Sequence, residues 1–121
     1  MAHAPLRTCP TCAAPVGEAT KLGLRDYRWV APLLPGRVAP TDLDCVLERH
    51  GKVLVLEFKP AGVRPGRGQA MTFDTLRAKD IDVWVVMGEG DLVDVDFGDG
   101  VVPDVPLTEV ARAVVDWYEA A

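Results

Sequence analysis

Residues 40–60 have the sequence PTDLDCVLERHGKVLVLEFKP, and this stretch decides the fold. Its second part, KVLVLEFK at 52–59, carries apolar side chains on both faces over residues 53–56. Such a run predicts a central β-strand that is covered on both sides. His50 and Gly51 predict a tight turn, so residues 42–49 are expected to form a second, antiparallel strand beside the first.

The chain on either side of this hairpin predicts further strands and helices. Residues 60–68 contain three glycines and two prolines and predict a loop. Helices are expected over 17–28, 69–79 and 107–118, a buried strand over 81–87 and a half-exposed edge strand over 91–97. The helix at 69–79 makes a crossover, so strands 52–59 and 81–87 are parallel if they share a sheet. The predicted fold class is an α/β sandwich with a central mixed sheet flanked by helices.

Length and composition fit one compact domain. The 121 residues are 49% hydrophobic and 26% charged, which is ordinary for a soluble domain. Prolines around Cys9 and Cys12 predict a knuckle or loop over residues 1–16, followed by a single domain over 17–121. No apolar run approaches the about 18 residues of a membrane span, and residues 1–10 do not resemble a signal peptide. We therefore expect a cytoplasmic protein with no membrane partner.

Charge is distributed unevenly along the chain, whose net charge is −5. Residues 1–79 contain 12 Lys/Arg and 7 Asp/Glu, whereas residues 80–121 contain 1 Lys/Arg and 11 Asp/Glu. Because phosphate contacts depend on local charge, the acidic total does not exclude a nucleic-acid partner. The acidic third can equally serve only as a solvated surface.

Charged side chains stand where the predicted hairpin ends. Glu57 and Lys59 share one face of a strand otherwise built for burial, and burying either charge alone is costly. Asp42 and Asp44 share a face of the neighbouring strand, so Asp44 and Glu57 can converge. Two converging carboxylates repel each other unless a cation lies between them. Oxygen ligands of this kind suit Mg²⁺ or Mn²⁺, which can activate water and stabilise charge on a phosphoryl oxygen.

This hairpin resembles the core of the PD-(D/E)XK nucleases, in which an acid opens one strand and Glu-x-Lys closes its neighbour. The resemblance covers roughly residues 40–88 and implies a restriction-endonuclease-like fold. It implies a metal held by Asp44, Glu57 and the backbone carbonyl of Phe58, with Lys59 assisting the attacking water. A glutamine often begins the next helix in this family, and Gln69 stands there.

Two features of the pattern leave alternatives open. Either Asp42 or Asp44 can be the primary acid; the apolar run that follows Asp44 favours it, and Asp42 would then support a second metal or cap the strand. Some members, including archaeal junction resolvases, use an acid from the first helix, for which Glu18 is the candidate and Asp26 the next. The competing interpretation is a Glu57–Lys59 ion pair at a sheet edge, with the two aspartates forming a turn.

Two smaller features suggest further binding sites. Arg64 and Arg67 lie in the glycine-rich loop after the catalytic strand, and arginine binds phosphate bidentately; the alternative is a solvated loop. Cys9 and Cys12 have the spacing of a zinc knuckle but supply only half of a tetrahedral site. Two chains could each donate this pair and so staple a dimer with Zn²⁺; otherwise the thiols are free.

The sequence therefore predicts a Mg²⁺- or Mn²⁺-dependent DNA endonuclease. So small a domain has little surface for reading a sequence, which favours structure-selective cleavage of junctions, flaps or ends. Cutting both strands would favour a homodimer, as in Holliday junction resolvases. The alternative is a non-catalytic module that binds nucleic acid or protein on a nuclease-like fold, in which zinc can staple two chains.

Overall fold

The computed structural model describes residues 33–36 and 40–121. The chain divides into two compact units, Met1–Pro40 and Thr41–Ala121, and every element below belongs to the second. The predicted helix over 17–28 and the predicted domain boundary after residue 16 lie outside the described residues.

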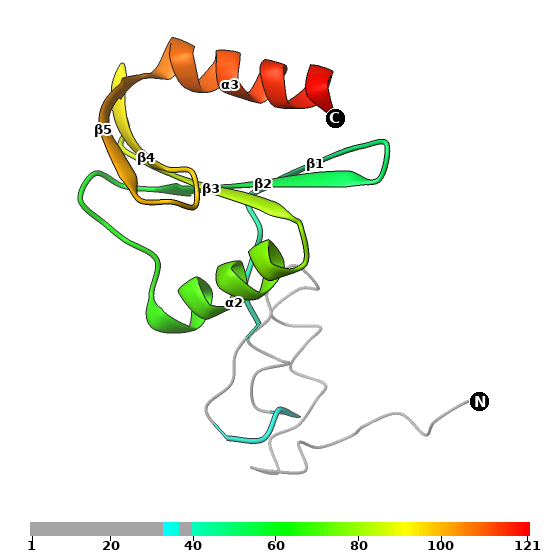
Figure 1. Ribbon diagram of the computed structural model, residues 1–121. Helices are drawn as coiled ribbons and strands as arrows, with labels where there is room; N and C mark the ends of the chain where they lie inside the picture. Colours follow the sequence, from blue (N-terminus) through cyan, green and yellow to red (C-terminus); the bar gives the residue numbers. More distant parts are fainter. Residues whose placement is uncertain (1–32, 37–39) are drawn as a thin grey trace, which may run out of the picture. The chain divides into compact units, whose positions relative to one another are not determined.

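A five-stranded mixed sheet forms the centre of the unit Thr41–Ala121 (Figure 1). In chain order the elements are β1 (Cys45–Arg49), β2 (Lys52–Lys59), α2 (Arg67–Ala78), β3 (Asp82–Met87), β4 (Leu92–Asp96), β5 (Val101–Pro106) and α3 (Leu107–Ala120). The strands lie in the order β1-β2-β3-β4-β5. The β2–β3 pair is parallel and the other pairs are antiparallel. The α/β class and the mixed sheet are thus confirmed.

The predicted crossover is also confirmed, because α2 connects β2 to the parallel strand β3. Figure 1 shows α2 on one face of the sheet and α3 on the other. Phe73 of α2 packs in a cluster with Val55, Val83 and Val85. Val110 of α3 packs in a second cluster that contains Val86, Val93 and Val95. Successive residues of β3 thus enter different cores, as strand alternation requires.

Two predicted boundaries and one predicted edge strand are wrong. The first strand begins at Cys45, so Asp42 and Asp44 precede it. The helix after the loop begins at Arg67, which places that arginine in the first turn of α2. The strand at Leu92–Asp96 is not an edge, because β5 pairs with it. The sequence did not predict β5, because it contains Pro103 and Pro106 and proline cannot donate a hydrogen bond to a neighbouring strand. Proline is tolerated in strands at the edge of a sheet, which is where β5 lies.

The β1–β2 turn explains the register of the hairpin. His50 and Gly51 have φ angles of 52° and 83°, and the backbone N–H of Gly51 donates to the Glu48 carboxylate at 2.8 Å. Positive φ at both central positions matches the right-handed twist of the paired strands. The pairs Cys45–Leu56 and Val46–Val55 follow from this turn and fix which side chains share a face.

Gly51→Ala is expected to destabilise the unit by about 1–2 kcal/mol, because an L side chain is strained in this left-handed conformation. Gly68→Ala is the matched control: it lies within α2, and a Cβ there would meet nothing within 4 Å. It should stabilise by about 0.5–1 kcal/mol. Urea unfolding of both variants measures the two effects, and a Gly51→Ala variant as stable as the parent would contradict the assigned turn.

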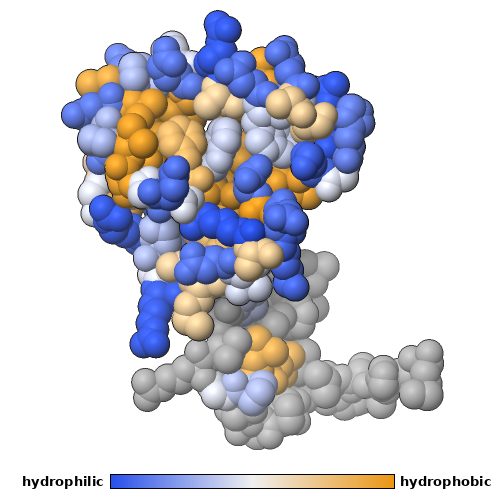
Figure 2. All heavy atoms as spheres, in the orientation of Figure 1, coloured by the Kyte–Doolittle hydropathy of each residue, from blue (hydrophilic) through white to orange (hydrophobic). Residues whose placement is uncertain are grey.

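The surface of the unit mixes charged and apolar groups. Figure 2 shows apolar side chains gathered over β4 and β5 in this view, and Leu92, Val102 and Leu107 are each about half exposed. Among the helices of the described residues, none is long and apolar enough to cross a membrane.

Candidate functional site

Among the residues that the structure describes, Glu57 is the one charged residue that is buried, with 4% of its surface exposed. It lies near the end of β2, an inner strand between β1 and β3. Because side chains alternate along a strand, Glu57 and Lys59 share the face of Val55, which is the face covered by α2. The sequence thus places a carboxylate beneath the start of a helix rather than in open solvent.

Only one of the two carboxylate oxygens of Glu57 is partnered. Oε1 lies 3.2 Å from Lys59 Nζ and accepts a 2.9 Å hydrogen bond from Gln69 Nε2. Oε2 is buried and has no hydrogen-bond partner within the described residues. A buried oxygen without a partner forfeits its hydration, so this atom is a position where a cation or a donor would be stabilised.

Asp44 is held beside β2 by the backbone. Its Oδ2 accepts a 2.9 Å hydrogen bond from the N–H of Phe58. The β1–β2 register ends at Cys45–Leu56, and its next position would bring Asp44 opposite Glu57. Residues opposite each other in an antiparallel pair point to the same face. An extension of the register therefore assigns the two carboxylates to the same face, and the hydrogen bond to Phe58 holds Asp44 next to the residue that follows Glu57.

The structure separates Asp42 from Asp44. Asp42 is exposed in the segment before β1, and no hydrogen bond or ion pair within residues 40–121 involves it. Of the remaining predicted ligands, Cys9, Cys12 and Glu18, together with Asp26, lie outside the described residues. Cys45 is a free, half-buried thiol. The arrangement therefore favours Asp44 as the acid that accompanies Glu57.

Lys59 and Glu57 do form the ion pair of the competing interpretation. The pair lies on β2, however, which is flanked by strands on both sides, so it does not lie at a sheet edge. The Nζ–Oε1 distance of 3.2 Å and the 22% exposure of the lysine side chain leave Nζ close both to the carboxylate and to solvent. The Lys59 ammonium group can therefore contact a negatively charged substrate while it offsets the charge of Glu57.

Arg64 and Arg67 are both exposed at the start of α2. The first turn of this helix has no acidic residue, and no side chain caps its N-terminus. Its first backbone N–H groups and the two guanidinium groups therefore carry positive charge on the same part of the surface.

The donor set can be tested against a divalent cation. No group of three or more His, Cys, Asp or Glu side chains within the described part of the chain is arranged to hold a metal. Asp44 and Glu57 supply carboxylates, and Phe58 adds a backbone carbonyl. Mg²⁺ is commonly bound through about one or two carboxylates while it keeps several waters. The residues present fit such an open site, and the unpartnered Oε2 of Glu57 is the observation that supports it.

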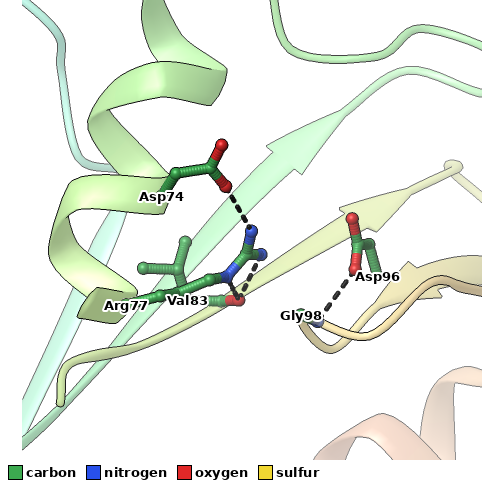
Figure 3. Close-up of polar contacts among 5 residues, drawn as sticks. All are labelled: Asp74, Arg77, Val83, Asp96 and Gly98. Carbon is green, nitrogen blue, oxygen red and sulfur yellow. Dashed lines mark hydrogen bonds and ion pairs between the residues drawn. The ribbon is translucent and has the colours of Figure 1, made fainter.

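Sequence reasoning missed the role of Arg77. Its Nε and Nη2 atoms donate to the carbonyl of Val83 at 3.2 and 2.7 Å, and Nη1 lies 3.6 Å from Asp74 Oδ1 (Figure 3). The two bonds to Val83 fasten the last turn of α2 to β3, while Gln69 donates from its first turn to Glu57 of β2. Nothing local marks Arg77, because its partner is a backbone carbonyl.

Comparison of the chain with protein-family models, with curated proteins and with solved structures finds no match. The assignment of the candidate site therefore rests on the geometry of its residues.

Proposed function

We propose that this protein is a Mg²⁺- or Mn²⁺-dependent endonuclease of the PD-(D/E)XK type that hydrolyses DNA phosphodiester bonds. The observation that carries the proposal is Glu57, a buried carboxylate with a lysine on one oxygen and nothing on the other. A buried carboxylate oxygen without a partner costs about 1–3 kcal/mol, so Oε2 is a position that a bound ion or a donor would stabilise. Buried polar atoms without a partner are few in native proteins, and a catalytic role or a bound ion is one explanation for them.

Each residue of the site then has a distinct role. Asp44, Glu57 and the Phe58 carbonyl would hold the cation, which supplies Lewis-acid stabilisation of the phosphoryl group and a more acidic water. Lys59 orients the attacking water and offsets negative charge that develops on the phosphate. Gln69 is a positioning residue, because its amide holds the Glu57 carboxylate through Oε1.

The basic start of α2 supports DNA as the substrate. Arg64 and Arg67, with the uncapped helix N-terminus, would bind backbone phosphates on either side of the scissile bond. Such contacts carry no sequence information, which fits structure-selective cleavage of junctions, flaps or ends. Cleavage of both strands would favour a homodimer with two active sites.

Asp44→Asn and Asp42→Asn test the assignment as a matched pair. With Mn²⁺ and branched or linear DNA, Asp44→Asn is expected to cut at least about a hundredfold more slowly, because a ligand carboxylate is lost. Asp42→Asn should cut at the parental rate. Parental cleavage by Asp44→Asn would refute the site, and loss in Asp42→Asn alone would exchange the two roles.

The second candidate is a non-catalytic module that binds nucleic acid or protein, with Cys9 and Cys12 binding Zn²⁺ between two chains. The observation that favours it is that no third acidic ligand joins Asp44 and Glu57 within the described residues. It predicts DNA or protein binding without cleavage in any divalent metal, and zinc in protein purified without chelator.

A further inference from the structure

A cavity of about 210 Å³ lies between α2 and the strands β3 and β4, outside the proposed metal site. Its floor is apolar and includes Phe73, Val85 and Met87, which are 1%, 3% and 6% exposed. Ligand sites for drug-sized molecules occupy about 300–1,000 Å³, so this cavity suits a smaller, flat, partly apolar group.

The rim of the cavity is polar but has no net charge. Asp74 and Arg77 come from α2, Asp96 from β4 and Arg64 from the loop before the helix. Figure 3 shows the Arg77 guanidinium between the helix and the strand, with Asp74 on one side and Asp96 beyond it. Two positive and two negative side chains cancel, which disfavours both a free phosphate and a metal ion as occupant.

The hydrogen-bonding capacity of the rim is unequal. Arg77 has most of its donors engaged, by the Val83 carbonyl and by Asp74 Oδ1. Asp96 Oδ1 accepts from the N–H of Gly98 at 2.8 Å. The second oxygens of Asp74 and Asp96 have no hydrogen bond within the described residues. The rim therefore offers carboxylate acceptors, with the exposed Arg64 as a donor.

The cavity adjoins the proposed catalytic residues. Val85 and Met87 are the parallel register partners of Glu57 and Lys59. Neighbouring strands lie about 4.8 Å apart, so the floor begins one strand spacing from the site. On the helix, Ala70 lines the cavity and directly follows Gln69.

We propose that this cavity binds one unpaired nucleobase that carries an amino group, from a DNA strand whose phosphate lies at Glu57 and Lys59. The inference rests on the proposed function. Unpaired bases are held by stacking on apolar side chains and by hydrogen bonds to their edges. Carboxylates accept from base amino groups, and arginine donates to guanine O6 and N7, so guanine matches the rim best. Thymine has no amino group and matches it least.

Titration of the full chain with dGMP, dTMP and deoxyribose 5-phosphate, followed by the NMR signals of the Val85 and Met87 methyl groups, tests the proposal without DNA cleavage. We expect saturable shifts with dGMP, at least tenfold weaker binding of dTMP, and no shift with the sugar phosphate. Ala70→Leu fills the cavity and should weaken dGMP binding at least tenfold. Thr75→Leu, an exposed change on the same helix, should leave it unchanged.

Asp96→Asn is a second test in case Ala70→Leu does not fold. The asparagine side chain can still accept the hydrogen bond from the Gly98 N–H, but the negative charge is removed. This substitution should also weaken dGMP binding. Equal shifts with dGMP and the sugar phosphate, or parental dGMP affinity in both Ala70→Leu and Asp96→Asn, would overturn the pocket assignment even if DNA is cleaved. Saturable dGMP binding without cleavage in any metal would instead refute the nuclease and leave the pocket standing.

Discussion

Glu57→Gln is expected to lower metal-dependent cleavage by about a thousandfold or more while the protein stays folded. The substitution preserves the size of the side chain and an oxygen that can accept from Gln69, but it removes the charge that would bind a cation. Lys59 loses its counter-ion, yet its side chain is 22% exposed and can reach water. The substitution should therefore lower the cleavage rate and leave the protein folded.

Thermal unfolding with and without Mn²⁺ gives a readout that does not depend on activity. A ligand that binds only the folded state at about 100 times its dissociation constant stabilises by about 2.7 kcal/mol. For a unit of this size that corresponds to a rise in Tm of about 10 °C or more. The parent should show this rise, and Glu57→Gln should show none.

Glu89→Gln is the control for this experiment. Glu89 is exposed in the turn between β3 and β4, and it should keep both the Mn²⁺ response and the cleavage rate of the parent. If Glu57→Gln and Glu89→Gln respond alike to Mn²⁺, no cation binds at Glu57 and the proposed chemistry fails.

Phe73→Ala should destabilise the unit by about 3–5 kcal/mol. Phe73 is 1% exposed and is the largest side chain among the fully buried ones, packed against Val55, Val83 and Val85. Its removal leaves a hole under α2 that neighbouring strands cannot close. Domains have a total stability of roughly 5–15 kcal/mol, so much of the folded population would be lost near 37 °C.

Met71→Ala provides the comparison on the same helix. Met71 is 59% exposed, and its substitution should change stability by no more than about 0.5 kcal/mol. Guanidinium unfolding of both variants measures the contrast. Similar losses for Phe73→Ala and Met71→Ala would mean that α2 does not pack on the sheet as described.

The sequence predicted the centre of this fold better than its margins. KVLVLEFK at 52–59 gave the bounds of β2, because an apolar run after a turn signal leaves little choice of register. The strand β5 was missed, because its stability comes from pairing with β4 rather than from its proline-containing sequence. Arg67 was assigned to a loop, since the neighbouring glycines obscured the start of α2.

The candidate site was predictable only as far as it follows from strand alternation. Alternation places Glu57 and Lys59 on one face, and the short turn brings Asp44 near them. The hydrogen bond between Phe58 and Asp44 distinguishes the two aspartates, and it depends on where β1 begins, which no local pattern indicates. The cavity beside Arg77 joins α2, β3 and β4 and has no signature in any one segment.

Helix α2 is bonded at both of its ends, by Gln69 to the Glu57 carboxylate and by Arg77 to the Val83 carbonyl. The helix is therefore fixed on the sheet, because moving it away would break both contacts and expose Phe73. Under the proposed function, adjustment to DNA of different shapes would fall to the segment between β2 and α2, where Gly62 has a φ of 74° and the chain is mostly exposed. The proposed metal ligands and Arg67, which belongs to α2, would keep their positions while Arg64 moves with that segment.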